Sequence, residues 1–218
     1  MGKFVRTVTS AGIRFRWFTC NCTEIRLPNG KYILIDPFLV RPDDEKYGKD
    51  WACGYTVDDL EGADYILLNH THMDHIVQLK EAYDRFHPRI LCHAATAIYV
   101  AATFGIDERD IFPFESHDTY DFGDFVLETS EGRHNAFKVA REPADMNNQG
   151  SIDFLMSLGW MYNTNFVIRL KDGETIGFSA GEWDDFTRSR WHEVHPNILF
   201  RHRRHWQMPA AEMAAEIA

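Results

Sequence analysis

The segment YILLNHTHMDHI, residues 65–76, constrains the fold more than any other part of the chain. Its apolar beginning, residues 65–69, is typical of a buried strand. The residues that follow, 76–86, repeat apolar side chains at helical spacing and end before Pro88. We therefore predict a strand that turns directly into a helix, with three histidines and one aspartate on the turn.

Further strands and helices are predicted on both sides of this turn. Residues 13–19 alternate apolar and polar side chains as a half-buried strand does. Asn-Gly and Asp-Gly pairs are typical of β-hairpin turns. The remaining predictions are hairpins at Asn29-Gly30 and Asp172-Gly173, strands over 90–93, 125–131 and 198–200, and a helix over 94–105 that ends at Gly105.

We expect one compact domain over residues 1–218, because nothing in the sequence resembles a linker or a repeat. Residues 135–163 are rich in Met, Asn, Trp and Phe and have weak periodicity. Such a segment is either a lid or pocket wall, or an irregular surface excursion. Residues 209–218 favour a helix.

Composition excludes several classes of partner and location. The chain has 218 residues, 44% of them hydrophobic, and a formal net charge of −10. An acidic protein is a poor general ligand for nucleic acid or anionic membranes. We find no apolar stretch of about 18 residues and no signal peptide, so we expect a cytoplasmic protein without a membrane partner.

The four cysteines form no CxxC pair. We interpret them as reduced, half-buried thiols, with a metal or redox role for Cys20 and Cys22 as the alternative.

The histidine cluster has the residue types and the spacing of a metal site. At the end of a strand, residues i and i+2 point the same way, so His70 and His72 can approach one ion together. A helix that starts near Asp74 turns Asp74 and His75 toward a second ion about 3.5 to 4 Å away. Imidazole and carboxylate suit Zn²⁺, Mn²⁺ or Fe²⁺. We assign Asp74 the catalytic role of binding metal and orienting a metal-activated hydroxide.

The sequence HTHMDH, residues 70–75, resembles the signature of the metallo-β-lactamase superfamily, and YILIDPFL and ADYILLNHTHMDHI resemble the segments around it. The resemblance covers roughly residues 12 to 183 and is poor in the middle. The opening NGKYILIDPFL is most similar to the branch that contains ascorbate-6-phosphate lactonase. This family implies an α/β fold, a four-layer αββα sandwich with two divalent metal ions at one edge between the sheets.

The family also implies a third histidine for the first ion, after a later strand. His134 fits this place, 62 residues after His72 (134 minus 72), and His117 is its main competitor.

A bridging aspartate should follow in an SGDT turn, but this chain has SAGEW, which puts Glu182 there. Asp184 and Asp185 are the substitutes; alternatively these acids begin a helix, where they suit the helix dipole.

The family also implies a last ligand histidine, which follows the final strand near the C-terminus. If residues 198–200 are the last strand, His202 or His205 is the ligand, and we assign His205. Alternatively, HWQMPAAEMAAE resembles a helix that precedes that strand in related branches. The C-terminal end is then truncated, and a partner subunit of a homo-oligomer is another source of the ligand.

Two further features have a functional and a structural reading. Arg201 and Arg204 either bind an anionic substrate or form a solvated charged face. Asp36 either supports a metal-bound histidine or is a residue of the turn at the strand end.

Together these features predict a metal-dependent hydrolase. The expected substrate is a small, anionic metabolite with an ester, lactone or phosphoester bond. A metal-binding or regulatory module without turnover is the main alternative, because Glu182 and the last histidine depart from the family pattern. Redox chemistry at two iron ions is a further alternative.

Overall fold

A computed structural model of the chain describes residues 6–9, 12–134, 147–179, 181 and 184–201. The chain divides into two compact units. The first comprises Met1–Glu115 and Val139–Tyr162, and the second comprises Ser116–Lys138 and Asn163–Ala218. We describe each unit by itself, and the single domain expected over residues 1–218 stays a prediction.

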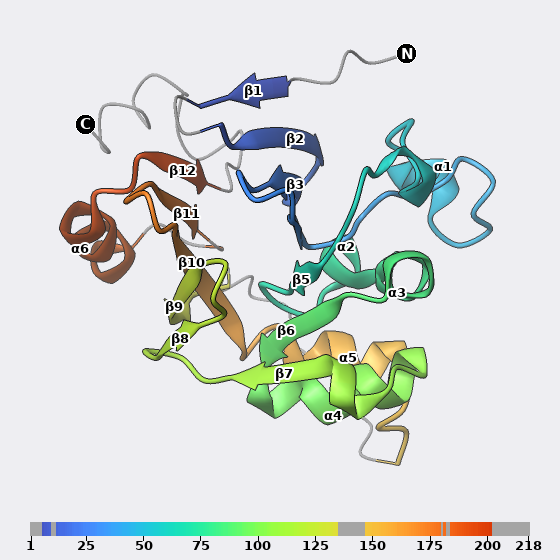
Figure 1. Ribbon diagram of the computed structural model, residues 1–218. Coiled ribbons are helices and arrows are strands. Elements are labelled where there is room, and N and C mark those ends of the chain that lie inside the picture. Colours follow the sequence, from blue (N-terminus) through green and yellow to red (C-terminus); the bar gives the residue numbers. More distant parts are fainter. Residues whose placement is uncertain (1–5, 10–11, 135–146, 180, 182–183, 202–218) are drawn as a thin grey trace. The chain divides into compact units, whose positions relative to one another are not determined.

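The first unit contains a seven-stranded mixed sheet in the order β1 to β7 (Figure 1). The strands β1 to β4 pair antiparallel, and β4 to β7 pair parallel. Strand β3 turns back into β4 through the expected Asn29-Gly30 turn, where Gly30 has a φ of 90°. The strands are Arg6–Val8, Arg14–Thr19, Cys22–Arg26, Tyr32–Ile35, Tyr65–Leu67, Arg89–His93 and Ile111–Phe114.

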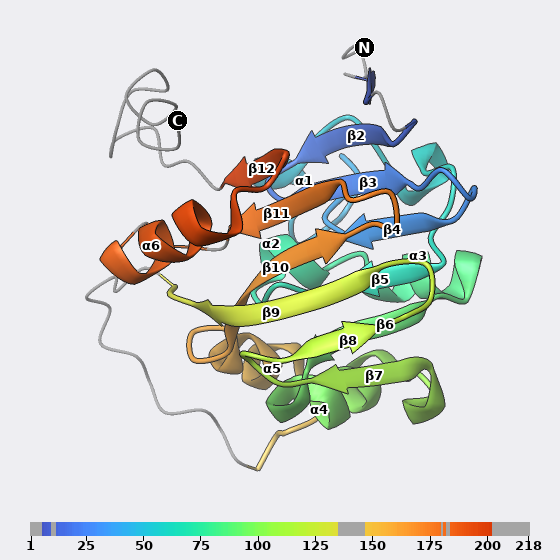
Figure 2. The ribbon, with the colours of Figure 1, turned by 60° about the vertical axis from the view of Figure 1, so that its left-hand side comes forward.

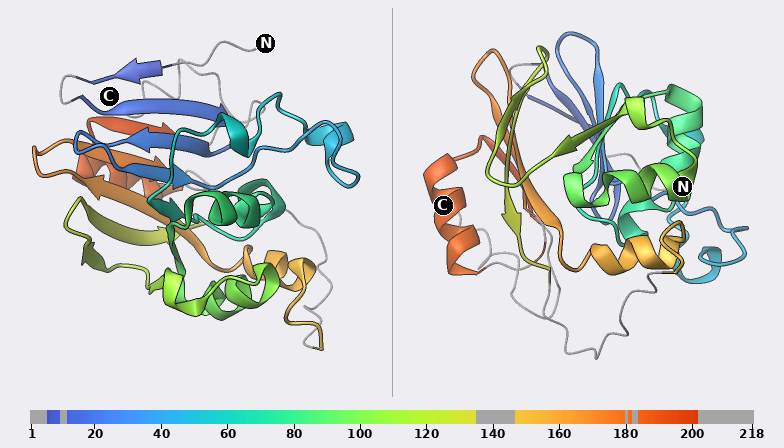
Figure 3. Two further views of the ribbon diagram at one scale, coloured as in Figure 1. Left: turned by 45° about the vertical axis from the view of Figure 1, so that its right-hand side comes forward. Right: turned by 90° about the horizontal axis from the view of Figure 1, so that it is seen from below.

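Helices cover one face of this sheet (Figure 3). Their apolar residues, among them Ile76, Leu79 and Val100, pack with Leu34 and Ile66 of the strands in one buried cluster. The unit therefore has the helix-on-sheet core that parallel strands require. Its helices are α1 (Gly48–Trp51), α2 (Met73–Ile76), α3 (Leu79–Phe86), α4 (Ala94–Phe104) and α5 (Ile152–Leu158), with short 3₁₀ turns at Val57–Asp59 and Glu108–Asp110.

The second unit contains a five-stranded mixed sheet in the order β12-β11-β10-β9-β8 (Figure 2). All pairs are antiparallel except β11 with β12. Helix α6 packs on β11, where the Trp191 ring lies so close to Gly177 that a side chain there would collide with it. The elements are β8 (Thr119–Asp121), β9 (Val126–Gly132), β10 (Asn163–Arg169), β11 (Thr175–Ser179), α6 (Asp185–Val194) and β12 (Ile198–Arg201).

The strands and hairpins expected from the sequence are present, but the helix predicted over 76–86 is divided into α2 and α3. Gln78 interrupts the predicted helix because it forms hydrogen bonds with residues that are distant in the sequence. Its side-chain Oε1 accepts a hydrogen bond from the Leu39 backbone, and its own backbone N–H donates to the carbonyl of Pro37. The segment after β4 thereby binds the chain between the two helices. The short strands β1, β7 and β8 were not predicted from the sequence.

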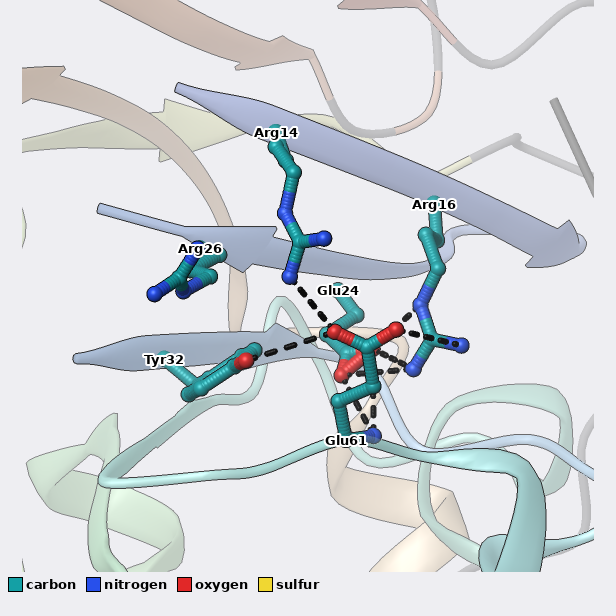
Figure 4. Close-up of a pocket in the computed structure, with 6 residues that line it drawn as sticks. All are labelled: Arg14, Arg16, Glu24, Arg26, Tyr32 and Glu61. Atoms are coloured by element: carbon teal, nitrogen blue, oxygen red, sulfur yellow. Dashed lines mark hydrogen bonds and ion pairs between the residues drawn. The ribbon is translucent and has the colours of Figure 1, made fainter. Parts of the chain in front are cut away.

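One buried ion pair lies at the antiparallel side of the first sheet (Figure 4). Arg16 on β2 faces Glu24 on β3, and the guanidinium donates to both carboxylate oxygens, from Nε at 2.7 Å and from Nη2 at 2.8 Å. Glu24 also accepts from the backbone N–H of Glu61 at 2.8 Å. Arg14 pairs with the Glu61 side chain at 2.6 Å.

Within the described part of the chain, no helix is long and apolar enough to cross a membrane. The C-terminal helix predicted over 209–218 lies outside the described residues.

Candidate metal centre

Parallel strands of the first unit bring the histidine cluster and Asp36 to one sheet edge. Asp36 follows β4, and Asn69 and His70 follow the neighbouring strand β5. Because these strands run parallel, the residues after their carboxyl ends lie together. His93 ends the next strand, β6, at the same edge.

His70 and His72 point their ring nitrogens toward each other. The distance from Nε2 of His70 to Nδ1 of His72 is 3.2 Å. Two nitrogen ligands of a tetrahedral ion, with bonds of about 2.0–2.1 Å, lie about 3.3 Å apart. The pair therefore fits the coordination shell of one ion.

A neighbouring amide sets the tautomer of His70. The Oδ1 atom of Asn69 lies 2.8 Å from Nδ1 of His70, and a carbonyl oxygen only accepts hydrogen bonds. Nδ1 therefore carries the proton, and Nε2 keeps its lone pair for a metal ion.

Asp74 and His75 form a second pair on α2. The carboxylate Oδ2 of Asp74 lies 3.5 Å from Nε2 of His75. Nδ1 of His75 donates to Oδ2 of Asp36 at 2.8 Å, so the ring presents Nε2 on the side of Asp74. This pair can also share an ion, because an oxygen and a nitrogen ligand are the donor set that first-row divalent metals accept.

Asp36 is the buried anchor of this arrangement. It is fully buried, with a φ of 45° that a residue other than glycine rarely adopts. Its Oδ1 accepts from the Asn69 backbone at 2.7 Å, and its Oδ2 also accepts from Asn21 at 3.3 Å. The contact with His75 is the one that a supporting role for Asp36 requires, and the turn conformation is present as well.

The electrostatics of His75 follow from the same contacts. Burial alone lowers the pKa of a histidine, but the charges of Asp36 and Asp74 and the hydrogen bond to Asp36 outweigh burial and raise the pKa of His75 above its usual value. Two carboxylates around one buried imidazole make this place attractive to a cation.

The described end of segment 135–163 forms a wall beside His72. Trp160 packs edge-on against the His72 ring, with centroids 4.3 Å apart, and Tyr162 lies against His93 at 4.8 Å. Gly159 approaches so closely that a Cβ would lie 2.8 Å from Cδ2 of His72. Thr71 also contacts this segment, because its hydroxyl donates to the Leu155 carbonyl at 2.7 Å. This agrees with the pocket-wall interpretation of the segment.

The other residues expected in the site belong to the second unit. His134 follows β9 after one residue, and the preceding Arg133 forms a parallel bridge with Gly181. A Cβ on Gly181 would lie 2.0 Å from the carbonyl oxygen of Arg133 and 3.2 Å from Cα of His134, and the residue has a φ of 68°, so only glycine fits there. Within its unit, His134 therefore lies beside the residue that precedes Glu182. Glu182, His202, Arg204 and His205 lie outside the described residues.

Asp184 and Asp185 have the helix-terminal roles that were their alternative interpretation. Asp184 caps α6: its Oδ1 accepts from the Thr187 backbone at 2.8 Å, and its Oδ2 pairs with Arg133 at 3.1 Å. Partial burial raises its pKa, but the Thr187 hydrogen bonds and Arg133 lower it further, to a net value below the usual one. The Asp185 side chain is fully exposed and pairs with Arg188.

Two further candidates lie at defined places in the second unit. His117 is exposed in a left-handed conformation and faces Phe186 of α6, with ring centroids 6.3 Å apart. Arg201 ends β12 and is partly buried.

Comparison with known proteins agrees with this arrangement. The model of one family, described as the beta-lactamase superfamily domain, matches residues 14–175. The chain belongs to this family. The two mixed sheets are those of the metallo-β-lactamase fold, as the sequence predicted.

Relatives of this chain include proteins named UPF0173 metal-dependent hydrolase. The one from Thermodesulfovibrio yellowstonii is 42% identical over 172 residues, 78% of this chain and 59% of the relative. One from Staphylococcus epidermidis is 28% identical over 95 residues, 44% of this chain and 38% of the relative. The chain thus spans about two to three fifths of these relatives.

Solved structures show the same fold at low sequence identity. A possible metal-dependent hydrolase from Veillonella parvula has a TM-score of 0.58 at 16% identity, covering 83% of this chain and 67% of that one. An isothiocyanate hydrolase from Delia radicum gut bacteria has a TM-score of 0.57 at 19% identity, covering 82% and 66%.

The sequence analysis did not identify Asn69, Gly159 or Trp160 as parts of the site. Asn69 could have been found, because it directly precedes the cluster at a strand end. Nothing in the sequence connects Gly159 and Trp160 to His72, which is more than 80 residues earlier.

Proposed function

We propose that this protein is a metal-dependent hydrolase with two divalent ions, of zinc, manganese or iron. One observation carries the proposal: two pairs of ligand atoms, His70 Nε2 with His72 Nδ1 and Asp74 Oδ2 with His75 Nε2, are 3.2 and 3.5 Å apart on one turn. The relatives named metal-dependent hydrolases support the same activity.

In this proposal, the remaining ligands come from the later part of the chain. His134 joins His70 and His72 at the first ion. Glu182 replaces the bridging aspartate of the family, and His205 joins Asp74 and His75 at the second ion. The Arg133–Gly181 bridge supports a joint role of His134 and Glu182, since it holds their two segments side by side within one unit.

Divalent ions at such a site lower the pKa of a water molecule and stabilise negative charge on an oxygen that develops during hydrolysis. Asp74 is the catalytic residue, which would bind metal and orient the water. Its side chain is about one third exposed, which leaves access for water and substrate.

The proposed substrate is a small, anionic metabolite that contains an ester, lactone or phosphoester. Arg201 and Arg204 would bind its anionic group, because guanidinium groups pair with phosphate and carboxylate in bidentate fashion. The resemblance to the branch of ascorbate-6-phosphate lactonase makes sugar-phosphate lactones the first compounds to screen.

Metal stoichiometry tests the proposal directly. We would purify the protein without chelator, measure bound metals by plasma mass spectrometry, and repeat the measurement after incubation with Mn²⁺ and Zn²⁺. We expect about two ions per chain, and hydrolysis of an ester or lactone that stops on chelation and returns with metal. One ion or none contradicts the dinuclear site. Two ions without hydrolysis of any screened ester, lactone or phosphoester favour the module without turnover.

A further inference from the structure

The second unit contains a cavity outside the proposed metal site, lined by residues of α6, β8 and β9 and of the segment before β8. Figure 2 shows where these helices and strands lie. Its volume is about 340 Å³. One wall is a single face of α6 with Phe186, Arg190 and Glu193, which are spaced four and three residues apart. The opposite wall is residues 117–119, and β9 forms the floor. We call this cavity the α6 trough.

Acidic groups exceed basic groups in the α6 trough. Asp118, Glu128 and Glu193 line it, against the single guanidinium of Arg190. Arg190 is already bound on both sides, to Glu128 at 3.1 Å and to Glu193 at 3.3 Å. Glu128 is further neutralised by Arg169. Arg169 and Arg190 together balance Glu128 and Glu193, so the surplus negative charge of the trough belongs to Asp118.

An aromatic ring also lines the α6 trough. Phe186 is 45% exposed and lines the trough. Its ring faces His117 edge-on across the trough. The π face of a phenylalanine attracts cations and also accepts an apolar stem.

A serine that is largely buried also lines the trough. Ser130 is only 4% exposed and lines the trough, yet its side chain makes no hydrogen bond to any residue in the described part of the chain. A ligand that carries N–H donors would supply one, because the serine oxygen accepts.

We propose that the α6 trough binds a small organic cation, a primary ammonium or guanidinium group on a short apolar stem. The carboxylates of Asp118 and Glu193 pair with the positive group, Ser130 accepts one of its hydrogens, and the stem packs on Phe186. An anion would meet the surplus negative charge, and a wholly apolar molecule would leave Ser130 without a partner. This inference does not depend on the proposed hydrolase activity.

Four probes test the charge requirement: the longer dication agmatine and three compounds of similar size, butylamine, neutral butyramide and anionic butyrate. Each is titrated into ¹⁵N-labelled full-length protein while backbone amide shifts are recorded. We expect saturable shifts with agmatine and butylamine, concentrated at residues 117–119, 128–130 and 186–193. Butyramide and butyrate should leave these amides unchanged.

Variants test the named contacts. Asp118→Asn and Glu193→Gln should each weaken butylamine binding roughly threefold to tenfold, because each removes one charge-assisted contact. Phe186→Leu should weaken it roughly twofold to fivefold. Glu45→Gln, an exposed carboxylate outside the trough, is the matched control and should have no effect. The three residues altered in the trough are all exposed, so the variants should fold.

The proposal is overturned if no probe shifts the trough amides, or if butyramide shifts them as much as butylamine does. It is also overturned if both carboxylate variants bind butylamine as tightly as the unaltered protein.

Discussion

Nδ1 of His75 lies 2.8 Å from Oδ2 of Asp36, a residue 39 positions earlier that follows the neighbouring parallel strand. This hydrogen bond fixes the ring and its tautomer, so that Nε2 faces Asp74. It makes Asp36 a positioning residue for the proposed second ion, since a carboxylate partner also raises the basicity of a ligand histidine.

We predict that Asp36→Ala weakens the binding of the second metal ion about tenfold to a hundredfold. The His75 ring loses its partner, and the Asn69 backbone loses the acceptor that lies 2.7 Å away. Competition with a chelating dye measures the two affinities separately. Asp36→Asn retains one acceptor oxygen, so its affinity for the second metal ion should fall less. Unchanged affinity in Asp36→Ala would rule out the positioning role.

Asp74→Ala should abolish hydrolysis, because Asp74 is proposed to bind metal and orient the water. The side chain is partly exposed and makes few structural contacts, so the melting temperature without metal should change little. Activity assays and thermal unfolding of chelator-treated protein check the two halves of this expectation. Retained turnover would disprove the catalytic assignment.

Gly159→Ala should weaken the binding of the first metal ion. The added Cβ would lie 2.8 Å from Cδ2 and 2.9 Å from the backbone nitrogen of His72, so either the wall or the ligand must move. We expect a loss of metal affinity of about tenfold, similar to the loss of a supporting contact. Gly150→Ala is the matched control, since nothing lies within 4 Å of its added Cβ. Equal metal affinity in both variants would contradict this close approach.

His93 predicts a pH dependence of stability. Burial lowers the pKa of His93, and the nearby Glu115 compensates only in part. In the unfolded chain His93 therefore binds a proton near pH 6.5, whereas in the folded chain His93 does so only at lower pH. Stability from this residue is complete above about pH 6.5 and falls as the pH drops toward the folded-state pKa, by at most about 1.4 kcal/mol per pH unit.

Urea unfolding of chelator-treated protein at pH 7.5 and 5.5 measures this dependence. His93→Gln should lose less stability between the two pH values than the unaltered protein does. The reverse order would show that the folded state favours the charged imidazole.

Glu24→Ala should lower the free energy of unfolding by at most about 3–5 kcal/mol, because the buried guanidinium of Arg16 loses the carboxylate to which it donates from Nε and Nη2 and keeps only Glu61, at 3.7 Å. Lys80→Ala is the control: it removes an exposed i,i+4 pair with Asp84 and should cost less than about 0.5 kcal/mol. Urea denaturation compares the two. Similar losses would mean that the Arg16–Glu24 pair contributes no more than a surface pair.

Local sequence predicted much of the fold because its signals are short in range. Alternation over 13–19, the Asn29-Gly30 and Asp172-Gly173 turns, and the stop at Gly105 all act within a few residues, and the structure has each element. The helix over 76–86 was wrong in detail, since Gln78 makes hydrogen bonds to Pro37 and Leu39, about 40 residues away. Propensity carries no information on such contacts.

The same division applies to the site. By itself, the sequence determined the cluster from His70 to His75 and its place on a strand-to-helix turn, because i, i+2 spacing on a strand end sets which side chains point together. Only the tertiary structure decided that Asp36 holds His75, and that Gly159 and Trp160 lie against His72. Strand pairing and core packing join these residues across 39 positions or more, and no local pattern specifies which distant partner fills each place.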